Sequence, residues 1–103
     1  MKKNNKIYNM YQITDYTYKQ AKKHGYAVKP STNKGKKIDV YKKEQKIASV
    51  GALGMYDYPT YLNLEKQGKV PEGTAKKRRE LYKKRHAKDL HAGAGRLANL
   101  LLW

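Results

Sequence analysis

The sequence predicts a small α+β fold: an N-terminal helix, a β-hairpin, and then two or three helices, including a long basic helix near the C-terminus. Its length of 103 residues suits one small domain. Two runs rich in β-branched or small apolar residues stand four residues apart in the middle of the chain. Segments with helix start and stop signals lie on both sides of these runs. We expect residues 1–12 to form a basic arm and residues 13–103 to form the single domain.

The N-terminal third contains one predicted helix and a basic loop. Thr14 or Asp15 provides an N-cap, and Gly25 ends the helix. Residues 28–31 form an extended exit, because the residue before a proline is pushed out of the α region. The lysine-rich loop centred on Gly35 is the expected flexible joint of the chain.

The middle of the chain predicts a β-hairpin followed by a short helix. Residues 37–41 alternate in polarity, as a half-buried strand does, and residues 46–52 are small and apolar. Residues 42–45 join them at hairpin length, although without the favoured Asn-Gly turn. Pro59 then suits the first turn of a helix.

The clearest predicted helix is basic and runs from Ala75 to about Leu90, with Thr74 as its cap. An amphipathic helix of a globular protein carries a broad apolar stripe, whereas this one offers only a narrow seam. The residues of that seam are Ala75, Leu81, Tyr82 and Leu90. A further basic helix or turn covers residues 95–103, in which Trp103 and the leucines before it are expected to anchor the packing.

Charge and composition restrict the function. The chain has 24 Lys and Arg residues against 8 Asp and Glu, which gives a formal net charge of +16. Such an excess repels itself in a compact state and indicates a polyanionic partner. No apolar run is long enough for a membrane span, and no apolar segment follows Met1-Lys2-Lys3 as a signal peptide requires. The absence of Cys excludes disulfides, thiolate metal sites and a cysteine nucleophile.

The expected binding site is the basic helix, assisted by the lysine-rich loop. All four arginines lie in the last quarter of the chain, and Arg pairs with phosphate bidentately, which Lys does not. We expect phosphate contacts from the cations, with Tyr82 stacking or donating its hydroxyl. The candidate nucleic-acid-binding residues are Lys34, Lys36, Lys37, Lys76, Lys77, Arg78, Arg79, Tyr82, Lys83, Lys84, Arg85 and His86.

The sequence gives no sign of an enzyme. His24, His86 and His91 lack the spacing of a metal motif, and no pair of carboxylates has the spacing of a nuclease site. Arg, His and Tyr on a single helix cannot surround one phosphate as they do in tyrosine recombinases. We therefore expect no catalytic residues, no cofactor, no metal and no small-molecule substrate.

Several blocks of the sequence resemble a family of small basic proteins encoded by giant viruses and other large double-stranded DNA viruses. The two most distinctive blocks are Asp57-Tyr58-Pro59-Thr60-Tyr61 and Arg78-Arg79-x-Leu81-Tyr82-x-x-Arg85-His86. The resemblance extends over about residues 18–103. It implies a viral source, a place in the virion or in the cytoplasm or nucleus of the host cell, and no secretion. The turn at residues 93–97 departs from the family pattern.

Three alternatives stay open at this point. The basic helix is either a nucleic-acid contact, with double-stranded DNA as the expected partner, or a solvated face with Glu80–Lys84 and Arg85–Asp89 ion pairs. Residues 56–61, rich in Tyr, either fill the core or stack on unpaired bases, and the core is favoured. The alternative function is a minor capsid or internal virion protein that cements coat subunits, with Tyr and Trp as interface anchors.

Overall fold

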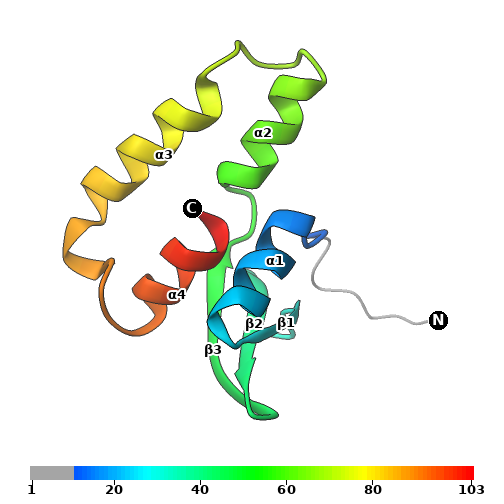
Figure 1. Cartoon of the computed structure of the whole chain (residues 1–103), viewed down its shortest axis with the longest axis vertical. Coiled ribbons are helices and arrows are strands. Elements are labelled where there is room, and N and C mark those ends of the chain that lie inside the picture. The colour runs from blue at the N-terminus through cyan, green and yellow to red at the C-terminus, as the bar shows by residue number, and fades with distance from the viewer. Residues whose placement is uncertain (1–10) are drawn as a thin grey trace. The chain divides into compact units, whose positions relative to one another are not determined.

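The computed structural model describes residues 11–103 and confirms the α+β class, with a helix, an antiparallel sheet and then further helices (Figure 1). The chain divides into two compact units, the first ending at Gly54 and the second spanning Met55–Trp103. The assignment of residues 13–103 to one domain stays a prediction. The basic arm expected over residues 1–12 lies almost entirely outside the described residues.

The first helix, α1 (Asp15–His24), has the boundaries that its flanking residues predict. The Thr14 side chain accepts a hydrogen bond of 3.3 Å from the backbone N–H of Thr17. At the other end, Gly25 has a φ of 82°, a left-handed conformation that is open to Gly at little cost. Local sequence is therefore sufficient to define this helix.

Three antiparallel strands follow in the spatial order β1-β2-β3: β1 (Ala27–Pro30), β2 (Lys36–Lys42) and β3 (Gln45–Ala52). The predicted hairpin is β2–β3. Its two turn residues, Lys43 and Glu44, both have positive φ, as a type I′ turn requires. The segment that was expected to be only an extended exit forms an additional strand, β1, which pairs with β2.

One face of this sheet carries the buried apolar side chains of the first unit. Val28 lies opposite Val40, and Ile38 lies opposite Val50. All four side chains are buried, as is Ala21 on α1, which contacts β1. Because side chains alternate along a strand, the residue between Ile38 and Val40 in β2 lies on the other face of the sheet.

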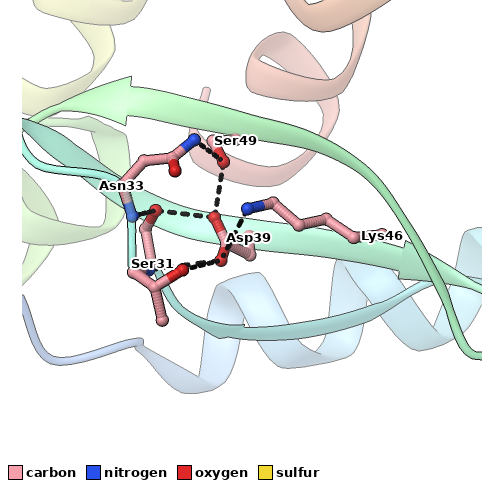
Figure 2. Close-up of polar contacts among 6 residues, drawn as sticks. Ser31, Asn33, Asp39, Lys46 and Ser49 are labelled. Carbon is pink, nitrogen blue, oxygen red and sulfur yellow. Dashed lines mark hydrogen bonds and ion pairs between the residues drawn. The ribbon is translucent and has the colours of Figure 1, made fainter.

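That other face holds a buried carboxylate, Asp39, in the middle strand (Figure 2). The hydroxyls of Ser31 and Ser49 each donate a hydrogen bond of 2.6 Å to its Oδ1. Its Oδ2 accepts from the backbone N–H of Thr32 at 3.2 Å and lies 3.4 Å from the Lys46 ammonium. Burial raises the pKa of Asp39, but the hydrogen bonds and the Lys46 charge outweigh it and bring the pKa to about 2. Asp39 is thus an ionised structural centre of the sheet.

The same network fixes the basic loop between β1 and β2. The backbone N–H of Asn33 donates to the Ser31 hydroxyl at 2.9 Å, and its side-chain amide donates to the Ser49 hydroxyl at 2.7 Å (Figure 2). The loop around Gly35 is therefore held by hydrogen bonds to two strands. The boundary between the compact units follows Gly54 rather than this loop, and the flexibility expected of the loop stays a prediction.

The second unit is helical, with α2 (Tyr58–Lys66), α3 (Thr74–Arg85), the short 3₁₀ helix η1 (Ala87–Asp89) and α4 (Gly93–Leu102). Helices α2 and α3 contact each other along their sides (Figure 1). The predicted entry into α2 is confirmed. The Asp57 carboxylate caps it by accepting from a backbone N–H of the first turn at 3.0 Å, and a proline stands in that turn.

Helix α3 differs from its prediction at both ends. It ends at Arg85 rather than near Leu90, because the chain continues into a 3₁₀ turn. Its N-cap is Gly73, with a φ of 92°, and the Thr74 hydroxyl instead donates to a carbonyl oxygen of the preceding loop. The carboxylate of Glu65 on α2 accepts the backbone N–H of Ala75 and supplies the cap from a neighbouring helix.

Helix α4 is apolar rather than basic. Leu97, Leu101 and Leu102 are buried, and Arg96 is its single charged residue. The expectation that this segment is a third basic helix is wrong, while its role in packing is confirmed. Among residues 11–103, no helix is both long enough and apolar enough to cross a bilayer.

Candidate nucleic-acid interface

Helix α3 concentrates positive charge on one side of the second unit. Seven of its 12 residues are Lys or Arg, and one is acidic. Helical geometry and exposure place five of the cations on a broad outer surface about 14 Å long. We call this surface the basic face, and it consists of Lys76, Lys77, Arg78, Lys84 and Arg85.

Two other side chains interrupt the basic face. Glu80 is exposed between the two ends of the helix. Leu81 is 41% exposed, so its assignment to the buried seam is wrong. The seam that α3 does bury consists of Ala75 with the half-buried side chains of Arg79, Tyr82 and Lys83. Because three of these four residues are polar or charged, the helix is held by contacts other than aliphatic packing.

Tyrosine rings hold two of the arginines. The guanidinium carbon of Arg79 lies 4.5 Å from the centre of the Tyr58 ring, and that of Arg78 lies 5.8 Å from the Tyr61 ring. Both tyrosines belong to α2, so these cation–π contacts join α2 to α3. Within the described residues, no carboxylate forms an ion pair with Arg78, Arg79 or Arg85. The helix packing therefore orients the guanidinium groups and leaves their charge uncompensated.

The ion pairs expected along the helix do not form in the described part of the chain. Glu80 lies beyond ion-pair distance of Lys84. Asp89 follows the end of α3, so it is not one helical turn beyond Arg85, and it lies 3.9 Å from the His86 ring nitrogen instead. The basic face therefore keeps its positive charge, because the carboxylate on α3 does not pair with its cations.

Tyr82 is engaged within the protein. Its ring stacks on Trp103 with centroids 4.3 Å apart and planes within 6°, and the His86 ring lies 4.4 Å from it. Burial and the nearby charge of Asp89 raise the pKa of Tyr82. These contacts use the ring faces that a stacked base would need, so Tyr82 and His86 act in packing, and Trp103 is the packing anchor that the sequence predicts.

The remaining candidate lysines fall into three environments. Lys83 is half-buried and donates a hydrogen bond of 2.8 Å to the Asn99 side chain. Lys37 is only 3% exposed and its ammonium lies 5.0 Å from the Tyr11 ring, so we remove it from the candidate surface. Lys34 is exposed on the loop fixed by the Asp39 network, and Lys36 is exposed at the start of β2. They belong to the first unit, so the structure does not group them with α3.

The tyrosine cluster before and within α2 is only partly in the core. Tyr58 and Tyr61 are half-buried, whereas Tyr56 is 55% exposed and meets the Tyr61 ring edge-on at 5.4 Å. The core assignment is therefore wrong for Tyr56. Sequence reasoning also missed Glu65 and Asp39, which fix α3 and the basic loop.

Within residues 11–103 no three His, Asp or Glu side chains gather as a metal site requires. No known protein family, no curated protein and no solved structure matches the chain. The likeness to proteins of large DNA viruses therefore stays a prediction. The assignment of a function rests on the geometry of this chain alone.

Proposed function

We propose that this protein binds nucleic acid, with double-stranded DNA as the preferred form, through the basic face of α3 and without catalysis. One observation carries the proposal. The basic face presents five exposed cations along two to three helical turns, and no carboxylate of the described chain pairs with its arginines. Phosphates of a nucleic-acid backbone are the partners that such a row of cations suits.

Charge energetics favour an external anion over a merely solvated helix. If acidic residues one turn away neutralised the cations of the helix, its surface would need only water as a partner. Each such ion pair would stabilise the helix by only about 0.3–0.5 kcal/mol. Here Arg78 of the basic face is positioned by Tyr61 instead. A cation–π contact orients a guanidinium group without removing its charge, so the group remains available to a phosphate.

Sequence-tolerant binding follows from the kind of contacts available. Lys76, Lys77 and Lys84 are flexible point charges that follow a phosphate backbone but do not distinguish bases. Exposed Glu80 and Leu81 stand among them and leave little room for a row of base contacts. We therefore propose a genome-associated role, and the predicted viral source would make that genome viral.

The alternative function, a cement between coat subunits, relies on Tyr and Trp side chains as interface anchors. Trp103 and Tyr82 stack on each other, and Tyr58 and Tyr61 lie against arginines. Among the Tyr and Trp side chains of residues 11–103, only Tyr18 and Tyr56 are exposed. The alternative has no specific contact in its favour, so nucleic-acid binding is the function that we propose.

Salt dependence of binding tests the proposal. With five cations on the basic face, affinity for duplex DNA should fall by about 10²–10³ between roughly 50 and 200 mM salt. The affinity should vary little among duplexes of unrelated sequence. Gel-shift or fluorescence-anisotropy titrations at the two salt concentrations measure both properties. Absence of binding at the lower concentration, or an affinity that salt does not change, would reject the proposed function.

A further inference from the structure

The buried side of α3 contains two cations that the proposed function does not use. Arg79 and Lys83 stand one helical turn apart, and both are half-buried. No carboxylate forms an ion pair with either of them in the part of the chain that the structure describes. Two like charges at this spacing oppose each other, so their position on the packed side of a helix is unfavourable without a counter-charge.

The Arg79 guanidinium keeps its hydrogen-bonding edge free. Its central carbon lies 4.5 Å from the centre of the Tyr58 ring, and a cation–π contact of this kind does not consume the N–H groups of the guanidinium. Its Nε atom is buried and has no hydrogen-bond partner within the described residues. An unsatisfied buried donor costs about 1–3 kcal/mol, and a hydrogen-bond acceptor beside it removes that cost.

Lys83 on α3 and Asn99 on α4 supply further hydrogen-bond donors on the packed side of α3. The Lys83 ammonium uses one of its three N–H groups to donate to the Asn99 Oδ1 at 2.8 Å. This bond leaves the other ammonium donors and the Asn99 amide N–H groups for a ligand. Burial and the Arg79 charge lower the pKa of Lys83, which agrees with two cations held close together in a partly dry environment.

We propose that Arg79, Lys83 and Asn99 form a discrete site for one phosphate group. A dianion compensates both charges at once, and a tetrahedral phosphate has enough oxygens to accept from a guanidinium fork, an ammonium and an amide together. A chloride ion offers neither the charge nor the geometry. The site differs from the basic face, whose exposed cations meet many phosphates with no fixed position.

The phosphate group has two sources to be distinguished, a free phosphate ion and the terminal phosphate of a nucleic acid. Thermal unfolding in inorganic phosphate, compared with chloride at equal ionic strength, tests the site itself. We expect phosphate to raise the melting temperature of the second unit by about 5 °C. A short oligonucleotide with and without a 5′-phosphate tests the source. A larger shift with the phosphorylated form assigns the site to nucleic-acid ends, and equal shifts assign it to the free ion.

Adjacent residues of the helix supply a matched control. Lys83→Gln should abolish the phosphate-specific rise in melting temperature, whereas Lys84→Gln removes the same charge from the basic face and should retain it. In the unchanged protein, the Asn99 side-chain amide signals should shift in an NMR titration with phosphate, which needs no variant to fold. Equal stabilisation by phosphate and chloride, or a full phosphate effect in Lys83→Gln, would overturn the site. Loss of duplex binding alone would overturn the proposed function and leave this inference intact.

Discussion

Replacement of Asp39 by Asn should destabilise the first unit in a pH-dependent way. The native pKa of this carboxyl is about 2, against 3.8 for an unperturbed Asp. Because the native value is the lower one, ionised Asp39 stabilises the fold at pH values above 3.8, and that contribution is lost as the pH falls towards 2. The difference between the two pKa values corresponds to about 2 kcal/mol at neutral pH.

Urea unfolding of Asp39→Asn and of the unchanged protein, followed by methyl NMR signals of Val40 and Val50, measures this quantity in the sheet itself. The two proteins should differ by about 2–3 kcal/mol at pH 7, and the difference should shrink by about 2 kcal/mol between pH 4 and pH 2. Asp15→Asn provides the control, since Asp15 is exposed and its replacement should cost less than about 1 kcal/mol. A pH-independent difference, or equal losses in both variants, would refute the assignment of Asp39 as the ionised centre of the network.

Three further substitutions have defined outcomes. Glu80→Gln removes the acidic interruption of the basic face and should raise duplex affinity by about threefold at low salt, measured by anisotropy. Combining Lys43→Asn with Glu44→Gly places residues suited to positive φ in the hairpin turn and should stabilise the sheet by about 1 kcal/mol in urea unfolding. Gly95→Ala places a methyl group within the Asp89 backbone and should cost about 1–3 kcal/mol by tryptophan fluorescence, although Ala is the better helix former.

The local sequence predicts the helix ends that are marked by a capping side chain, a glycine or a proline. Thr14 and Gly25 bound α1 as the sequence predicts, and Pro59 lies in the first turn of α2 as expected. The end of α3 has no such signal, because the residues after Arg85 are compatible with a longer helix. The 3₁₀ turn that follows is a tertiary feature, with the Gly95 backbone close against the turn. Sequence periodicity alone does not contain that contact.

The candidate site was predictable in charge but not in geometry. The cluster of cations on α3 follows from the residue types, whereas their division into two sides of the helix depends on α2. Tyr58 turns Arg79 inward, and Tyr82 is covered by Trp103, which lies 21 residues later in the chain. The burial of Lys37 in the sheet was likewise not predictable from the sequence. Alternation does not predict that a lysine beside Ile38 is buried.

The most direct test of the basic face compares salt dependence between two charge-matched variants. The first variant neutralises exposed cations of α3 by replacement with Gln, at Lys76, Lys77, Lys84 and Arg85. The second removes the same charge from exposed positions on α1 and α2, at Lys19, Lys22, Lys23 and Lys66.

The slope of log affinity against log salt concentration for duplex DNA is the measured quantity. The first variant should lose about three to four from the magnitude of that slope, because each phosphate contact contributes about 0.9. The second variant should keep a slope close to that of the unchanged protein. Equal slopes in the two variants would contradict the assignment of binding to α3, since net charge alone would then account for the interaction.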